Sequence, residues 1–305
     1  MSRKPSNQNT TDAIAIKSLA TNVVKDDEGI WVAGDDRNIS YPESHHQVFF
    51  GIEEDSFWFN HRNTIIGHVV DAYFPGGLFI DIGGGNDVVA DHLRGRGVEA
   101  VVLEPIRLGA INAKKRGLPF VICSTVQELG LKPGSVPSFG LFDVLEHIED
   151  DAGFLQMLYD YLIPGGFLYL TVPAYRTLWS VDDVADGHYR RYTSRTLATA
   201  LGSAGFTIRF ASYFFSFLPP AIFLMRTVPS ILRLRRGVTE SQAQLDHSRP
   251  SDNLNKLLDW FLRFEVSRIT SQKAIQFGSS CIAVVEKPAV SSTTPRTKAG
   301  GELKR

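Results

Sequence analysis

The stretch that most constrains the fold is an apolar run that stops at an acid and three glycines, Leu78-Phe79-Ile80-Asp81-Ile82-Gly83-Gly84-Gly85. The segment 88–96 that follows has a helical pattern, so the sequence predicts a strand, a tight turn and a helix. Glycine has no Cβ and adopts positive φ easily, which lets this backbone bend sharply and approach a ligand closely. Ligands of open α/β sheets bind beyond the carboxyl ends of the strands. The turn therefore predicts a nucleoside-binding crevice.

A second acid supports a nucleoside ligand. Val101-Val102-Leu103 predicts the next strand, and Glu104 follows it directly. An acidic side chain about 20 residues after the glycines can accept hydrogen bonds from both ribose hydroxyls.

The spacing of the glycines distinguishes between two nucleoside cofactors. A dinucleotide fingerprint requires G-x-G-x-x-G, and here Gly83-x-Gly85 is followed by Asn86, Asp87 and a valine. Asp81 and Asp87 would also place negative charge where a pyrophosphate should lie. A cofactor with an amino-acid tail and a cationic centre tolerates those acids. The alternative at this point is a glycine turn that binds nothing, because such a motif alone is weak support for a ligand.

Composition narrows the class of protein. With 43% hydrophobic and 21% charged residues, the 305-residue chain is typical of a globular protein with a large core. Its net charge of −1 gives no basic footprint for nucleic acid. Cys123 and Cys281 lie far apart in apolar runs, and we expect buried thiols in a reducing compartment, with neither a disulfide nor a zinc site. No signal peptide is visible, so we expect a cytoplasmic protein.

The ends of the chain predict little structure. We expect a flexible N-terminal arm over 1–55, irregular between residues 30 and 56, and a disordered tail over 289–305. The pair His45-His46 has no cysteine or acid at ligand spacing, so we interpret it as surface or lid histidines and predict no metal site.

The main domain is predicted to span 56–288 and to begin with a helix. The pattern from Ser56 to Ala72 is that of an amphipathic helix packed before the first strand. It would carry Arg62 to the mouth of the crevice, where a guanidinium can grip a carboxylate with two hydrogen bonds. Periodicity alone allows equally an exposed arginine without a ligand.

Further strands alternate with helices. Five more strands are predicted, and helical patterns over 151–162 and 194–204 lie between some of them. The sequence therefore predicts an α/β fold with a mostly parallel, doubly wound, seven-stranded sheet. The fourth strand ends at Asp143, followed by Glu146 and His147, which should share the sheet edge of Gly83 and Glu104. The additional strands are predicted over 118–123, 138–142, 167–172, 206–214 and 279–286.

A polar loop after the fifth strand holds the candidate catalytic groups. It contains His188, Arg190, Arg191 and Tyr192, a set that could orient an acidic or phenolic substrate and move its proton. Because it leaves the carboxyl end of a strand, it should lie over the crevice. The alternative is a solvated basic loop that ends in a helix cap at Thr193-Ser194.

A helical insertion, about 215–278, is predicted before the last strand. Its first part, 215–236, has no acidic residue, many large apolar residues, three prolines and four arginines. It is too short and interrupted to span a bilayer. We interpret it as a lid over the substrate pocket, or as an interfacial element that contacts anionic headgroups at the inner face of the membrane.

Taken in order, these motifs resemble the class I S-adenosylmethionine-dependent methyltransferases, with a Rossmann-like fold. The resemblance covers about 57–288 and rests on the Asp81-Ile-Gly83-Gly-Gly85 turn, Glu104, Asp143-Val-Leu-Glu146-His147, Pro164-Gly165-Gly166 and Ala204-Gly205-Phe206. Within that class the chain is similar to a bacterial subgroup with a Gly187-His188-x-Arg190-Arg191-Tyr192-Thr193 loop, often found beside cell-surface sugar and lipid biosynthesis.

The resemblance implies roles for individual residues. Asp81, Gly83 and Gly85 would line the methionine moiety of S-adenosyl-L-methionine, and Glu104 its ribose. Asp143, with Glu146 and His147, would form the floor near the reacting methyl group. Thr125 stands where an acid usually meets the adenine amino group. Asn86-Asp87 and Pro137-Ser138 also depart from the common pattern.

The expected reaction moves the methyl group to a small-molecule, lipid-linked or sugar-linked acceptor, at oxygen, with S-adenosyl-L-homocysteine as product. His188 would be the base, with His147 second. Two other classes stay open: an NAD-dependent oxidoreductase or epimerase, and a catalytically silent membrane-docking or scaffold protein that works through 215–236.

Overall fold

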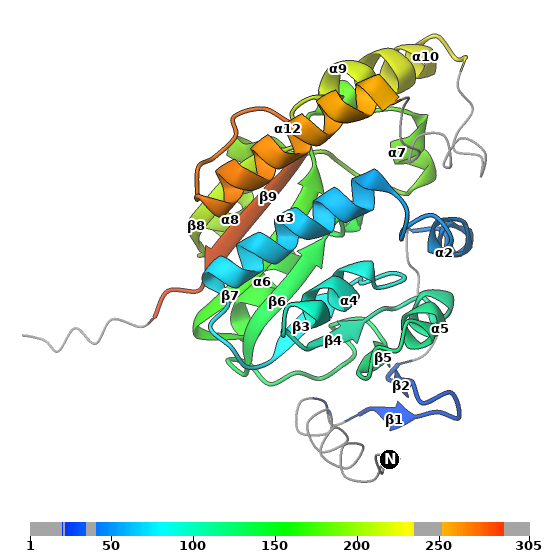
Figure 1. Cartoon of the computed structure of the whole chain (residues 1–305). Coiled ribbons are helices and arrows are strands. Elements are labelled where there is room, and N and C mark those ends of the chain that lie inside the picture. The colour runs from blue at the N-terminus through cyan, green and yellow to red at the C-terminus, as the bar shows by residue number, and fades with distance from the viewer. Residues whose placement is uncertain (1–19, 21, 35–40, 235–251, 290–305) are drawn as a thin grey trace, which may run out of the picture.

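The computed structural model describes residues 20, 22–34, 41–234 and 252–289. In these residues a central sheet of nine strands has helices on both faces (Figure 1). Its strand order is β1-β2-β5-β4-β3-β6-β7-β9-β8. One hydrophobic cluster lies on each face of the sheet, built from alternate residues of the same buried strands. Residues 1–19 of the predicted flexible arm and nearly all of the predicted tail lie outside the described residues.

All seven predicted strands are present. The first five pair in parallel, and the last two are antiparallel to their neighbours, which makes the sheet mostly parallel. Their bounds are β3 (Phe79–Ile82), β4 (Ala100–Leu103), β5 (Val121–Cys123), β6 (Val136–Phe142), β7 (Leu162–Pro173), β8 (Thr207–Phe214) and β9 (Ser280–Glu286).

Two short strands make the predicted count of seven wrong. β2 (Trp31–Val32) pairs in parallel with β5, and β1 (Val24–Lys25) pairs antiparallel with β2. Both lie in the segment predicted to be a flexible arm. Two-residue strands show no periodicity that a sequence could reveal, and it is the edge of β5 that orders them.

The helices connect the strands in alternation. Their bounds are α3 (Phe57–Tyr73), α4 (Val88–Gly95), α5 (Arg107–Lys115), α6 (Asp151–Tyr161), α7 (Val181–Ala185) and α8 (Ser194–Ser203), with short turns η1 (Leu145–His147) and η2 (Arg176–Leu178). Ser56 caps α3 by accepting hydrogen bonds from the N–H groups of Trp58 and Phe59. Thr193 caps α8 in the same way, as the alternative interpretation of the polar loop predicted.

Part of the predicted irregular arm is helical. Residues Glu43–Phe50 form α2, which lies at the carboxyl ends of the parallel strands. Its His46 is buried, with 3% of its surface exposed. The helix has a weakly amphipathic sequence, and its packing against α5 is what stabilises it. The expectation of an irregular arm between residues 30 and 56 is therefore wrong for this segment.

The insertion between β8 and β9 forms a cap at one end of the sheet. It contains α9 (Leu218–Ile222), the π-helical turn η3 (Phe223–Thr227), α10 (Val228–Ile231) and the long α12 (Asp252–Thr270). In Figure 1, α12 lies along α3, and the rings of Phe217 and Phe261 join the two parts of the insertion. Among the described residues no helix is both long and apolar enough to cross a membrane.

Candidate active site

The glycine turn between β3 and α4 has the geometry that only glycine allows. Gly83 and Gly85 have φ of 67° and 62°. A Cβ on Gly83 would lie 2.7 Å from Val144 Cγ2, closer than real side chains approach one another. The backbone of β3 and the loop after β6 can therefore meet only with glycine at this position.

Glu104 points toward this turn. Its Oε2 accepts the N–H of Gly85 and its Oε1 accepts the N–H of Ile106, both at 2.7 Å. His46 of α2 lies 3.8 Å from the same carboxylate. Two hydrogen bonds to backbone N–H groups orient the carboxylate and leave lone pairs for a ligand, since an ionised carboxylate has about four acceptor sites.

A cavity of about 1030 Å³ extends from this turn into the interior of the cap. At one end it is lined by Gly83, Gly85, Glu104 and Thr125, and at the other by apolar side chains of α9 and α12. Thr125 is uncharged, and its Oγ1 donates a hydrogen bond of 2.9 Å to Glu128 Oε2. One continuous space thus joins the predicted nucleoside crevice to an apolar compartment.

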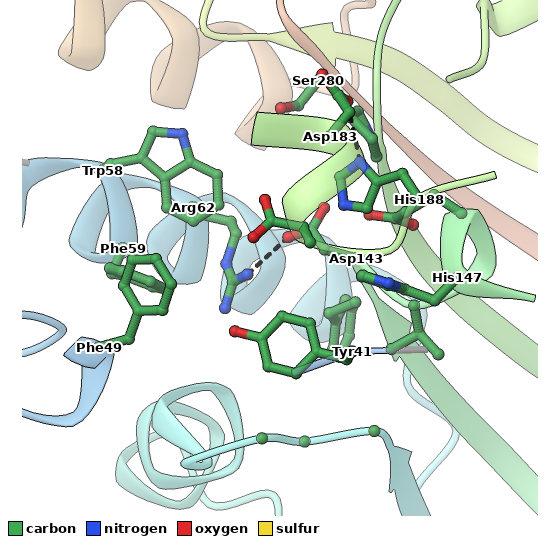
Figure 2. Close-up of a pocket in the computed structure, with 18 of the residues that line it drawn as sticks. Tyr41, Phe49, Trp58, Phe59, Arg62, Asp143, His147, Asp183, His188 and Ser280 are labelled. Carbon is green, nitrogen blue, oxygen red and sulfur yellow. Dashed lines mark hydrogen bonds and ion pairs between the residues drawn. The ribbon is translucent and has the colours of Figure 1, made fainter. Parts of the chain in front are cut away.

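Arg62 and Asp143 meet where the two compartments join (Figure 2). The guanidinium Nη1 lies 2.6 Å from Asp143 Oδ2. The Arg62 side chain is 10% exposed and packs over the rings of Trp58 and Phe59. The structure therefore excludes the interpretation of Arg62 as an exposed arginine. Its guanidinium binds the carboxylate of Asp143, which follows the last residue of β6.

His188 lies beside Asp143 on the side away from Arg62 (Figure 2). Its Nδ1 is 3.0 Å from Oδ1 of the buried Asp183, which also accepts a hydrogen bond from Arg191 Nε. Burial opposes ionisation of Asp183, but these two cationic or donating partners outweigh it and lower its pKa to about 2. Asp183 therefore stays ionised and orients the imidazole of His188.

His147 and Glu146 come from η1, next to His188. The rings of His147 and His188 are 4.6 Å apart in an edge-to-face arrangement. Burial, and then the neighbouring His188, lower the pKa of His147 to about 3. Burial, and then Asp143, raise the pKa of the Glu146 carboxyl well above its usual value. The donor atoms of Glu146, His147 and His188 lie within 4.8 Å of one another, although the sequence predicted no metal site.

Three of the residues that the sequence predicted to contact the substrate or the cofactor do not line the cavity. Arg190 pairs with Asp151 at 2.6 Å, and the hydroxyl of Tyr192 donates to the same acid. Arg190 and Tyr192 both hold the loop against α6, so the expectation that they contact a substrate is not supported. Asp81 lies beneath the glycine turn, with 1% of its surface exposed, and does not line the cavity.

The sequence did not single out several residues that line the cavity. Tyr41 contacts the rings of His46 and His147, and Trp58 stacks on the ring of Phe215. The pattern Ser180-x-x-Asp183 is a capping box that starts α7, and it was the available signal for a fixed acid in the loop. No local pattern indicates Tyr41, which reaches the site from before α2.

The model of a family described as "Methyltransferase domain" matches residues 59–209, just under half of the chain. The match includes the glycine turn, Glu104, η1 and the His188 loop. No curated protein matches the sequence.

Solved structures extend the likeness beyond that range. Phosphoethanolamine N-methyltransferase 2 of Haemonchus contortus, in complex with phosphomonomethylethanolamine and S-adenosylhomocysteine, superposes with a TM-score of 0.51 at 16% identity. The match covers 82% of this chain and 58% of that one, so this chain spans less than two thirds of its length. A Thermotoga maritima protein described as an S-adenosylmethionine-dependent, possible histamine N-methyltransferase gives 0.50 at 17% identity, covering 79% and 99%.

This is the S-adenosylmethionine-dependent methyltransferase fold. At such identities the likeness concerns the fold alone.

Proposed function

We propose that the protein transfers the methyl group of S-adenosyl-L-methionine to an oxygen atom of a small acceptor that carries an apolar or lipid-linked part. The product of the cofactor is S-adenosyl-L-homocysteine. The observation that carries this proposal is the continuous cavity of about 1030 Å³ between the Glu104 end and the apolar compartment under α9 and α12. A methyl donor and an acceptor can meet in it without crossing solvent.

The cofactor occupies the end of the cavity near the turn. Glu104 accepts hydrogen bonds from the ribose hydroxyls, and Gly83 and Gly85 let the backbone approach the methionine tail. Arg62 supplies positive charge for the carboxylate of that tail. Asp143 places negative charge near the sulfonium, whose positive charge it complements. Thr125 lies near the adenine.

The acceptor lies against His188. Methyl transfer is an in-line displacement in which the acceptor oxygen bonds to the methyl carbon as the carbon–sulfur bond breaks, and its rate depends mainly on holding the two atoms in line. His188, oriented by Asp183, removes the hydroxyl proton. His147 is the weaker candidate, because an imidazole whose pKa is lowered to about 3 is a poor base near neutral pH. Arg191 supports Asp183 rather than the substrate.

The far end of the cavity favours an acceptor with an apolar part. Phe217, Leu218, Met225 and Phe261 line it, and Arg226 stands at the same end. Immediately outside, η3 and α10 expose further large apolar side chains, among them Leu224 at 65% and Ile231 at 69%. The segment from Phe215 to Leu234 has no acidic residue. We propose that this face contacts an anionic lipid surface, from which the acceptor enters.

The test has two stages. In the first, purified protein is titrated with S-adenosyl-L-homocysteine, and separately with NAD, by calorimetry and thermal denaturation. In the second, methyl-labelled S-adenosyl-L-methionine is incubated with the protein and either a lipid extract or the water-soluble fraction of the same cells. We expect affinity for the homocysteine product alone, and label in the lipid arm. No affinity for the product, or stabilisation by NAD instead, would end the methyltransferase proposal; label only in the soluble arm would end its lipid-linked part.

A further inference from the structure

A cluster of three potential metal ligands lies at the acceptor end of the cavity. Glu146 and His147 are adjacent in η1, and His188 comes from the loop that follows α7. One ligand atom from each lies within 4.8 Å of the other two. All three residues line the cavity, so an ion among them would also be open to a small molecule.

Glu146 is the first reason to expect an ion. Its side chain is buried, with 1% of the residue exposed, and its Oε2 has no hydrogen-bond partner in the described part of the chain. Burying a carboxyl oxygen without a partner is costly, and each such group in a native protein needs an explanation. A bound cation supplies the missing partner.

His188 is the second reason, because its neighbours fix which nitrogen is available. Nδ1 lies 3.0 Å from Oδ1 of Asp183, so this nitrogen is engaged by the carboxylate and Nε2 is the nitrogen left for an ion. A carboxylate that holds the outer nitrogen of a histidine is the usual support of a metal-binding imidazole. Asp183 is itself held by Arg191, so the arrangement is rigid.

His147 is the third potential ligand. Hydrogen bonds with the backbone of Gly187 and Asp186 hold its ring in place. Metal binding requires neutral histidine and ionised carboxylate, and both histidines here are held in place by groups outside the cluster.

We propose that Glu146, His147 and His188 bind one divalent first-row transition cation, such as Zn²⁺ or Mn²⁺. Two imidazoles and one carboxylate favour such ions over Mg²⁺ or Ca²⁺, which prefer oxygen ligands alone. Three protein ligands leave positions open for water or for the acceptor oxygen, as in catalytic rather than structural sites.

The site deepens the proposed methyl transfer, and this consequence rests on that function. With the ion bound, His188 acts as a ligand instead of a base. The ion then lowers the pKa of the coordinated acceptor hydroxyl, whose proton passes to water before the oxygen bonds to the methyl carbon and the carbon–sulfur bond breaks. Binding of the ion does not require any methyl transfer, so the two proposals can fail separately.

The experiment measures ion binding by the full chain without any substrate. Protein treated with EDTA and dialysed is titrated with Zn²⁺ and with Mn²⁺ by calorimetry, and Co²⁺ is followed by its visible absorption. The same titrations are made on Glu146→Gln and His188→Ala. Matched controls are Glu99→Gln, on an exposed glutamate, and His68→Ala, on a histidine of α3 outside the cavity.

We expect one ion per chain in the wild type and both controls, and affinity at least about tenfold weaker in Glu146→Gln and His188→Ala. Without metal, Glu146→Gln should melt no lower than the wild type, because it removes an unpartnered buried carboxyl group. Adding the ion should raise the Tm of the wild type and of both controls more than that of Glu146→Gln and His188→Ala. Unchanged affinity in both ligand variants, or no binding of any of the three ions, would overturn the proposal. Binding of S-adenosyl-L-homocysteine by the same variants reports separately on the cofactor end.

Discussion

Glu104 accepts the backbone N–H of Gly85 at 2.7 Å, which joins the ends of two neighbouring parallel strands at the crevice. The hydrogen bond turns the carboxylate toward the glycine turn, the orientation that a ribose-binding acid needs. Had Glu104 pointed away from Gly85, the nucleoside interpretation of both motifs would have failed.

The first prediction concerns that carboxylate. Replacing Glu104 by Ala removes hydrogen bonds to a charged group, each worth about 1.5–3 kcal/mol. We expect the affinity for S-adenosyl-L-homocysteine, measured by calorimetry, to fall by on the order of tenfold to a hundredfold. Glu99→Ala, on the exposed end of the loop before β4, is the control and should bind as the wild type does. Equal dissociation constants for both variants would contradict the assignment of Glu104 to the ribose.

The second prediction concerns pH. Burial raises the pKa of Asp81 to about 7, against 3.8 in an unfolded chain. Between these values the folded protein binds more protons at Asp81 than the unfolded protein does, so stability without ligand should fall as pH rises from about 4 through 7. The slope due to this group is at most about 1.4 kcal/mol per pH unit. Urea denaturation at pH 5 and pH 7.5 should show a smaller loss in Asp81→Asn than in the wild type; an identical loss would show that Asp81 ionises as readily when folded.

A third prediction concerns Glu265, which joins the insertion to α3. Its carboxylate is 2.8 Å from His61 Nε2 and accepts the N–H groups of Phe215 and Ser216. Burial opposes ionisation, but these hydrogen bonds hold the pKa of Glu265 below its usual value. Breaking a buried charged network costs about 3–5 kcal/mol. Glu265→Ala should lose that much free energy of unfolding in urea, and Arg263→Ala, exposed on the same helix, less than about 0.5 kcal/mol. A loss below about 1 kcal/mol for Glu265→Ala would mean that the network does not hold the cap.

A fourth prediction tests the proposed lipid-facing surface. Placing charge on the apolar face with the double change Leu224→Asp and Ile231→Asp should abolish co-sedimentation with vesicles that contain anionic lipid, because it opposes both apolar insertion and attraction to the headgroups. Val24→Asp is a matched control, since Val24 is 72% exposed on β1, at the far side of the molecule in Figure 1. Equal sedimentation of the double variant and this control would place any membrane contact elsewhere.

Much of the fold follows from local patterns. Buried parallel strands appear as short apolar runs, and the helices between them as amphipathic periods, so seven strands and the helices α3, α4, α6 and α8 are predictable. Two-residue strands and α2 are not, because β5 and α5 stabilise them through contacts distant in sequence.

The site divides in the same way. The sequence by itself determined that Gly83, Gly85 and Glu104 meet at one crevice, because a glycine turn and an acid at the next strand end are consequences of strand order in a parallel sheet. The tertiary structure decided which polar side chains face the cavity. Arg190 and Tyr192 turn to Asp151, whereas Glu146, His147 and His188 converge, and no spacing rule distinguishes them, because the direction of a side chain is set by what packs behind it.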